Sequence, residues 1–235
     1  MRRFIFGILL VALVGTSAGL YFAAEPMKNN LPTMQDTALP TAAPEMEGNS
    51  DAQHQGNLPL LVNGAHPLPE DYKPDELIRL YDRKERNFEL AASDIKVGGQ
   101  TFRAMQKMFL AAAEDGVEGF IITSGYRTRK RQRELYEERQ DDTVQKPGCS
   151  EHESGLAFDV TARGGTGGFE TTRQFQWLSQ NCAEYGFILR YPQGKEQETG
   201  IAYEPWHYRY VGREAAREIM SRGITLETYC AEKGA

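Results

Sequence analysis

The sequence holds few of the residues that most often bind metals. Its 235 residues include only three cysteines and four histidines. No two cysteines form a Cys-x-x-Cys pair, so a zinc site built from cysteines has little support.

An excess of positive charge is also missing, because the net charge at pH 7 is −6. A mildly acidic chain with a single short basic run argues against nucleic acid as a partner.

The cysteines are too few and too scattered to define a disulfide framework. They are Cys149, Cys182 and Cys230. Export would permit a disulfide, but an odd count leaves at least one thiol over. We therefore expect either one disulfide or three small buried side chains, and the sequence does not choose the pair.

One long apolar run is present, at the beginning of the chain. Residues 1–24 contain two arginines followed by uncharged, mostly apolar residues. This pattern predicts either a signal peptide or a membrane anchor, and its continuation through Phe22 favours an uncleaved anchor. The arginines would stay in the cytoplasm. We expect the rest of the chain on the outer side of the cytoplasmic membrane, or secreted if the segment is cleaved.

The next segment, residues 25–57, is rich in proline, asparagine, threonine and acid, without apolar periodicity. Such a segment cannot bury enough surface to fold, so it predicts a flexible linker. Residues 58–235 then form a single domain, which we expect to be a monomer.

Helix and strand patterns alternate within this domain. Helices are predicted over residues 97–116, 128–140, 169–186 and 213–223, a helical turn or two over 75–82, and strands over residues 58–62, 120–123, 154–162, 187–192 and 204–211. The strands are close enough along the chain to form hairpins. We therefore expect an α+β fold, with a small antiparallel sheet and flanking helices.

Two short motifs could supply metal ligands. "SEHESGLAFD" contains His152 and Asp159, and "EPWH" contains Glu204 and His207. Strand alternation places Asp159 on the face opposite Phe158. Two imidazoles and one carboxylate could hold zinc at three corners, while the other carboxylate deprotonates a water at the fourth. The His-Asp spacing alone also fits a hydrogen-bonded structural pair.

Several segments together carry a family resemblance. They are "LPLLVNGAHPLPEDYKP", "SGYRTRKRQRELY", "PGCSEHESGLAFDVTA", "WLSQNCAEYGFILRYPQGKEQETGIAYEPWHYRYVG" and "GITLETY". In this order they resemble the D-alanyl-D-alanine carboxypeptidases of the VanY type, the M15 zinc peptidases, over roughly residues 58–230. The resemblance implies zinc (Zn²⁺) as the cofactor, with His152, Asp159 and His207 as ligands. It implies Glu204 as the catalytic base.

The resemblance also implies contacts with the substrate. Ser150, Gln132 and Arg127 match positions that contact substrate in the family, and Arg127 would share the developing oxyanion charge with zinc. Each has another interpretation, because Ser150 could cap a turn and Gln132 could be a solvated helix residue. Arg127 could be a surface arginine at the start of the basic run 127–133. Within it, the stretch Arg129–Arg133 is interpreted as a solvated helix face, although it could attract anionic wall polymers.

Three functions follow from the resemblance. The first is a zinc D,D-carboxypeptidase that removes the terminal D-alanine from peptidoglycan stem peptides ending in D-Ala-D-Ala. The second is an L,D-carboxypeptidase that acts on tetrapeptide stems. The third is a non-hydrolytic, zinc-bearing module that binds the cell wall. The presence of Glu204 beside all three ligands favours an enzyme, because a binding module needs no base.

Overall fold

The computed structural model describes residues 58–139, 144–164 and 168–234. The predicted apolar segment and linker, residues 1–57, lie outside the described residues and stay predictions. Among the residues described, no helix has both the length and the apolar character needed to cross a membrane.

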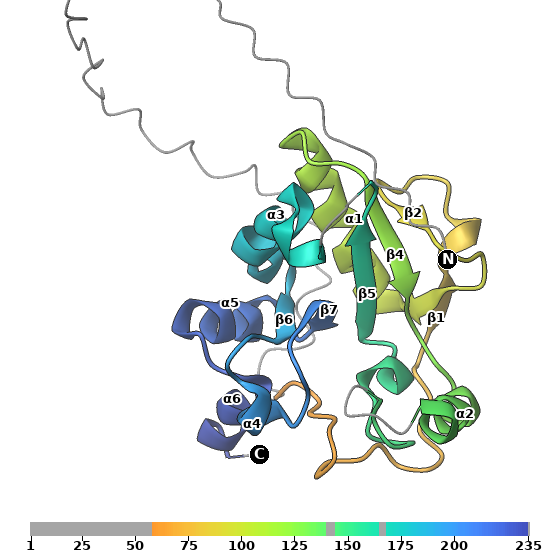
Figure 1. The fold of residues 1–235 in the computed structure, drawn as a ribbon, viewed down its shortest axis with the longest axis vertical. Coiled ribbons are helices and arrows are strands. Elements are labelled where there is room, and N and C mark those ends of the chain that lie inside the picture. The colour runs from red at the N-terminus through yellow and green to blue at the C-terminus, as the bar shows by residue number, and fades with distance from the viewer. Residues whose placement is uncertain (1–57, 140–143, 165–167, 235) are drawn as a thin grey trace, which may run out of the picture. The chain divides into compact units, whose positions relative to one another are not determined.

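Five strands form the central sheet, in the spatial order β2-β4-β5-β7-β6 (Figure 1). They are β2 (Glu89–Leu90), β4 (Phe120–Ser124), β5 (Ala157–Ala162), β6 (Phe187–Tyr191) and β7 (Glu204–Tyr210). The pairs β4–β5, β5–β7 and β6–β7 are antiparallel, as predicted. Strand β2, however, pairs with β4 in parallel. The sheet is therefore mixed, and the prediction of a purely antiparallel sheet is wrong at this edge.

The parallel edge has a physical reason. A parallel pair needs a long crossover connection, and the chain between β2 and β4 supplies one through β3 (Lys96–Gly98) and helix α1 (Gly99–Glu114). Strand β2 has only two residues, too few to leave an alternating pattern in the sequence.

The first described residues depart furthest from the predictions. Residues 58–62, which were expected to form a strand, are described and form none. Their backbone pairs with a side chain instead. The carbonyl of Leu60 accepts a hydrogen bond from Arg209 Nη2 at 2.5 Å. The predicted helical turns over 75–82 are β1 (Leu77–Arg79), paired with β3, followed by the 3-10 helix η2 (Leu80–Asp82).

The remaining helices are α2 (Arg129–Arg139), α3 (Arg173–Asn181), α4 (Glu196–Thr199), α5 (Arg213–Arg222) and α6 (Leu226–Glu232). The single helix predicted over 169–186 is divided into η4 (Phe169–Thr171), α3 and η5 (Cys182–Tyr185). The division begins at Thr172, whose hydroxyl caps α3 by accepting from the Phe175 amide. Helices α4 and α6 were not predicted.

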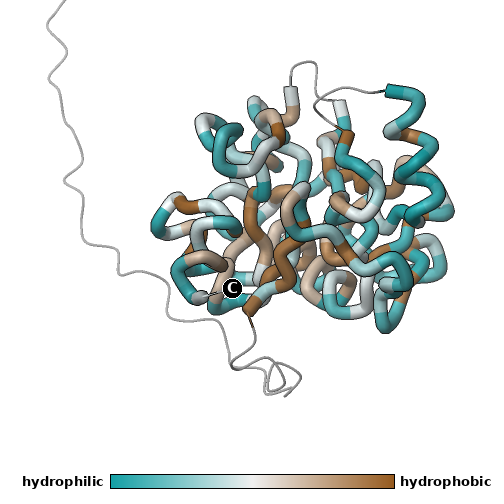
Figure 2. The backbone as a smooth tube through the Cα atoms, turned by 90° about the horizontal axis from the view of Figure 1, so that it is seen from below, coloured by the Kyte–Doolittle hydropathy of each residue, from teal (hydrophilic) through white to brown (hydrophobic). Residues whose placement is uncertain are grey.

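Helix α1 covers one face of the sheet. The apolar side chains that recur every three or four residues along it are buried, as predicted, and the Phe109 ring lies 4.8 Å from that of Phe120 on β4. Figure 2 shows hydrophobic residues gathered within the fold and hydrophilic ones toward the outside. Phe158 on β5 and Tyr208 on β7 belong to this core. Their strand neighbours, Asp159 and His207, therefore point to the opposite face, where the candidate site lies.

All three cysteines are buried, and none of them forms a disulfide. Burial raises the pKa of the Cys182 thiol to about 12. Of the two alternatives drawn from the sequence, the structure therefore fits three buried thiols.

Candidate functional site

Three side chains from different elements of the fold converge beside the sheet. His152 lies on the 3-10 helix η3 (Glu151–Ser154), Asp159 on β5 and His207 on β7. Asp159 and His207 are direct partners in the register of the two strands. One nitrogen or oxygen from each residue lies within 4.8 Å of the others. The fold therefore brings together the three residues that the resemblance implied as ligands.

A glycine fixes the turn that carries His152. Gly155 ends η3 with a φ of 75°, in the left-handed region that disfavours side chains. Its carbonyl accepts hydrogen bonds from the Gly98 amide at 2.8 Å and from the Thr101 hydroxyl at 2.9 Å. These bonds attach the end of η3 to the beginning of α1.

Each imidazole turns one nitrogen toward Asp159 and the other away. His152 places Nε2 3.3 Å from Asp159 Oδ2, while its Nδ1 lies 2.8 Å from the Gly125 carbonyl oxygen. His207 places Nδ1 3.1 Å from Asp159 Oδ1, while its Nε2 lies 3.2 Å from Glu151 Oε2. Histidines that bind metals use the second ring nitrogen in this way, as a donor to a carbonyl or carboxylate.

The state of Asp159 tests whether a metal fits here. Its Oδ1 atom is buried and has no hydrogen-bond partner among the described residues, although His207 Nδ1 lies close. A buried carboxylate oxygen without a partner is costly, and a shared cation would satisfy it. Two imidazole nitrogens and one carboxylate oxygen are a donor set that suits zinc. The three residues therefore fit a metal site.

The charges around the cluster favour ligation by Asp159. Burial alone would raise the pKa of Asp159, but His152 and His207 hold it well below its ordinary range. Burial lowers the pKa of His152 and keeps that ring neutral. Burial alone would also lower the pKa of His207, yet Asp159 and Glu151 raise it to about 9. A metal that binds Nδ1 of His207 must therefore displace a proton.

Glu204 lies beside the cluster, and its pKa is higher than that of an ordinary glutamate. It begins β7, is only 7% exposed, and places Oε2 3.7 Å from His207 Nδ1. Burial raises its pKa to about 7, in spite of the opposing effect of His207. A carboxyl group with a pKa near neutrality can both accept and return a proton at physiological pH.

Arg127 and Gln132 lie together next to the same cluster. Arg127 is half-buried and donates from Nη1 to Gln132 Oε1 at 2.7 Å and from Nη2 to the Ser124 hydroxyl at 3.3 Å. Gln132 is completely buried, so its interpretation as a solvated helix residue is wrong. Ser150 is 4% exposed and precedes η3, but its side chain does not cap that helix.

Glu151, which immediately precedes His152, was not predicted as part of the site. Its side chain is fully buried and joins His207 to the buried Arg190 and Arg209. A faint signal was available, because both arginines lie within strands whose other residues are mostly buried. Arginine is rarely buried without a partner, but nothing in the spacing points to Glu151 as that partner.

Comparison with known proteins agrees with this geometry. Residues 94–213 match the family model of VanY, D-alanyl-D-alanine carboxypeptidase. The chain is 36% identical over 199 residues to the putative carboxypeptidase YodJ of Bacillus subtilis (strain 168), covering 79% of this chain and 71% of the relative. It is also 36% identical over 209 residues to a D-alanyl-D-alanine carboxypeptidase of Enterococcus faecalis (strain ATCC 700802 / V583), covering 79% and 72%.

Two solved structures of carboxypeptidases share this fold. The LdcB LD-carboxypeptidase matches with a TM-score of 0.65 and 33% identity, over 73% of this chain and 84% of that one. A mutant of the vancomycin-resistance D,D-pentapeptidase VanY in complex with Zn(II) matches with a TM-score of 0.60 and 35% identity, over 72% and 96%. On this combined similarity of sequence, fold and metal-site geometry, the chain belongs to the VanY-type D-alanyl-D-alanine carboxypeptidases of the M15 peptidase family.

Proposed function

We propose that this chain is a zinc-dependent D,D-carboxypeptidase, which hydrolyses the last peptide bond of peptidoglycan stem peptides ending in D-Ala-D-Ala. The observation that carries the proposal is the cluster of His152, Asp159 and His207 with Glu204 at its edge. The cleaved bond consumes one water and releases D-alanine. Stem peptides lie outside the cytoplasm, which agrees with the export and membrane anchoring expected from residues 1–24, and we propose that the chain acts there as a monomer.

In this proposal, separate residues bind the metal and transfer the proton. His152, Asp159 and His207 would hold zinc, which supplies a Lewis acid for the scissile carbonyl and lowers the pKa of water. Glu204 accepts the proton of the attacking water and then gives it to the leaving amino group, so one carboxyl acts as base and acid.

The substrate side of the site is proposed from the second group of residues. The Arg127 guanidinium stabilises the negative charge that develops on the carbonyl oxygen, and Gln132 positions it through their 2.7 Å hydrogen bond. Gln132 and Ser150 also contact the substrate in this proposal. Their positions support these roles, because Gln132 accepts from Arg127 and Ser150 directly precedes the helix η3 that carries His152.

A second candidate is an L,D-carboxypeptidase that acts on tetrapeptide stems. The specific observation in its favour is the similarity to LdcB, with a TM-score of 0.65. The D,D reading is preferred because the family model and the Enterococcus faecalis relative carry the D-alanyl-D-alanine carboxypeptidase description.

One experiment separates these candidates. The full chain, loaded with zinc, is incubated with a pentapeptide stem ending in D-Ala-D-Ala and separately with a tetrapeptide stem ending in one D-Ala. Released D-alanine is followed by mass spectrometry. Release from the pentapeptide alone is the expected result, whereas release from the tetrapeptide alone would establish the L,D activity. If neither peptide releases D-alanine at full zinc occupancy, the result would favour a non-hydrolytic module that binds the cell wall.

A further inference from the structure

A buried group of four charged side chains lies behind the metal site. It consists of Glu151 on η3, Arg190 on β6, Arg209 on β7 and Glu227 on α6, and we call it the Glu151 relay. The side chains of Glu151 and both arginines are completely buried, and that of Glu227 is 18% exposed. Burying three charges completely and a fourth in large part costs free energy, so their arrangement calls for an explanation.

Glu151 uses its two oxygens for different purposes. Oε1 accepts from Arg190 Nε at 2.7 Å and from Arg209 Nη1 at 2.8 Å. Among the residues that the structure describes, the partner of Oε2 is His207 Nε2, at 3.2 Å. The carboxylate is therefore fixed by the two arginines on one side, and it presents a single acceptor to the imidazole on the other.

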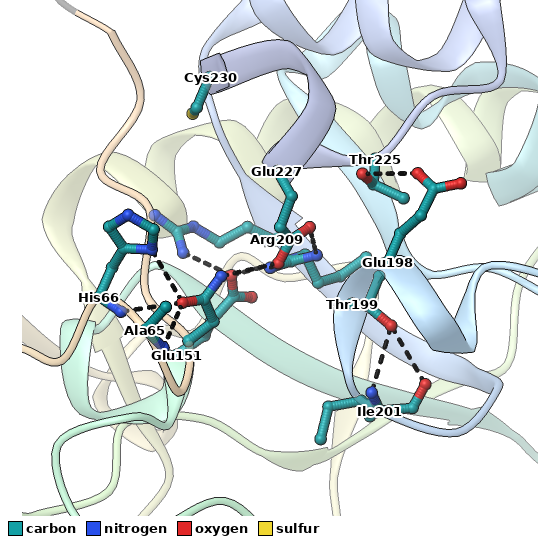
Figure 3. A network of polar contacts seen from close by, with 12 residues as sticks. Ala65, His66, Glu151, Glu198, Thr199, Ile201, Arg209, Thr225, Glu227 and Cys230 are labelled. Carbon is teal, nitrogen blue, oxygen red and sulfur yellow. Dashed lines mark hydrogen bonds and ion pairs between the residues drawn. The ribbon is translucent and has the colours of Figure 1, made fainter.

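Figure 3 shows Glu151 and Arg209 below the helix that carries Glu227, beside the segment of Ala65 and His66. Glu227 binds Arg190 through two hydrogen bonds, at 2.9 and 2.5 Å, and also accepts from Asn63 Nδ2 at 3.1 Å. The relay therefore runs from His207 to helix α6. Neither Asn63 nor Glu227 lies in the segment that matches the family model, residues 94–213.

The charge of Glu151 determines which nitrogen of His207 carries a proton. Arg190 and Arg209 both donate to Oε1 of Glu151, at 2.7 and 2.8 Å, so the carboxylate is paired with two cations and is ionised. An ionised carboxylate only accepts hydrogen bonds. When a metal displaces one proton of His207, the proton that stays lies on Nε2, which faces Glu151, and Nδ1 offers its lone pair beside Asp159.

From this arrangement we infer that Glu151, held between Arg190 and Arg209, is a positioning residue that orients His207 with Nδ1 toward the metal. The inference rests on the proposed zinc site and adds a residue that supports one ligand. It also explains the two buried arginines. They fix the carboxylate in place and compensate its charge, and Glu227 compensates theirs.

The substitution Glu151→Gln tests this role with almost no change in shape. A glutamine has one acceptor and one donor group. If its oxygen faces the two arginines, its amide donates to Nε2 and forces the proton of His207 onto Nδ1. If its oxygen faces His207, the amide meets two guanidinium donors. Both orientations disturb the ligand, so the dissociation constant for zinc should rise by about 10–100-fold.

Glu153→Gln is the matched control. Glu153 lies two residues away on the same turn and is also buried, but it accepts from the Gly148 amide and from Arg129. Zinc affinity is measured for both full-chain variants by competition with a chromophoric chelator, and folding by thermal unfolding. Weaker binding in Glu151→Gln alone is the expected result. Equal affinity in both variants, or equal losses, would overturn the inference.

Two measurements cover the case in which Glu151→Gln does not fold. Glu227→Gln acts at the exposed end of the relay and should weaken zinc binding in the same direction, by less than about tenfold. In the unmodified zinc-loaded chain, ¹⁵N correlation spectra of the histidine rings should show the His207 proton on Nε2. A proton on Nδ1 would overturn the inference. Failure of the unmodified chain to bind zinc would instead reject the proposed function.

Discussion

At the scale of single residues, Glu204 is the group whose chemistry is easiest to isolate. Glu204→Gln preserves size and removes the base, so kcat should fall by about 10²–10⁴-fold. Steady-state release of D-alanine from the preferred stem peptide measures this. The three ligand side chains are unchanged, so metal analysis should find the same zinc content as in the unmodified chain. Full activity in the variant would reject Glu204 as the base.

The three metal ligands could be predicted from the sequence, but the residues that hold those ligands in position could not. His152, Asp159 and His207 lie in short motifs that are visible by eye, and their convergence follows once the motifs are linked by a family resemblance. The role of Glu151 depends on Arg190 and Arg209, which are 39 and 58 residues further along the chain. No local pattern records such a partnership, because only the folded sheet brings the three together.

At the scale of elements, helix α2 is attached to the site by an arginine that the sequence suggested was solvated. Arg129 pairs with the buried Glu153 and donates from Nη2 to the carbonyls of Leu68 and Pro69, at 3.2 and 3.1 Å. The interpretation of the basic run as a solvated face is therefore wrong for this position. The physical reason is that Glu153 needs a partner when buried.

We expect Arg129→Met to destabilise the fold by about 2–3 kcal/mol, because it leaves the Glu153 carboxylate buried without its cation. Urea unfolding of the zinc-loaded chain measures the change. Arg133→Met is the control on the same helix, since Arg133 is exposed. It should change stability by no more than about 0.5 kcal/mol. Equal effects at the two positions would show that the Arg129–Glu153 pair contributes nothing.

The elements themselves were predictable where the apolar period was long. Helix α1 repeats its buried positions over 16 residues, and its apolar pattern predicted correctly which face is buried. Strand β2 and helix α4 have only two and four residues, which is too short for any period to appear. The segment 58–62 is apolar enough for a strand, but α6 and Arg209 use its carbonyls, which no sequence pattern reveals.

At the scale of the whole molecule, the metal should stabilise the fold. The three ligands converge only in the folded chain, so zinc binds the native state in preference to the unfolded one. At a free zinc concentration about 100 times the dissociation constant, the gain is about 2.7 kcal/mol. For a chain of this size that corresponds to a rise in Tm of about 5–11 °C.

Calorimetry of the full chain with zinc and with excess chelator measures this shift. The chelator should also abolish the release of D-alanine, and added zinc should restore both activity and Tm. A Tm that is unchanged by the chelator would indicate that the cluster of His152, Asp159 and His207 binds no metal in the folded chain.

The strand order has a kinetic consequence. Asp159 and His207 lie on β5 and β7, which have neighbouring strands on both sides, in the part of a sheet that usually exchanges its amide hydrogens last. Local fraying at the edges would leave these two ligands in place. Loss of the ion in the native state would therefore begin at His152, whose turn lies outside the sheet. Exchange of zinc with solution should then follow the opening of η3, long before the sheet itself unfolds.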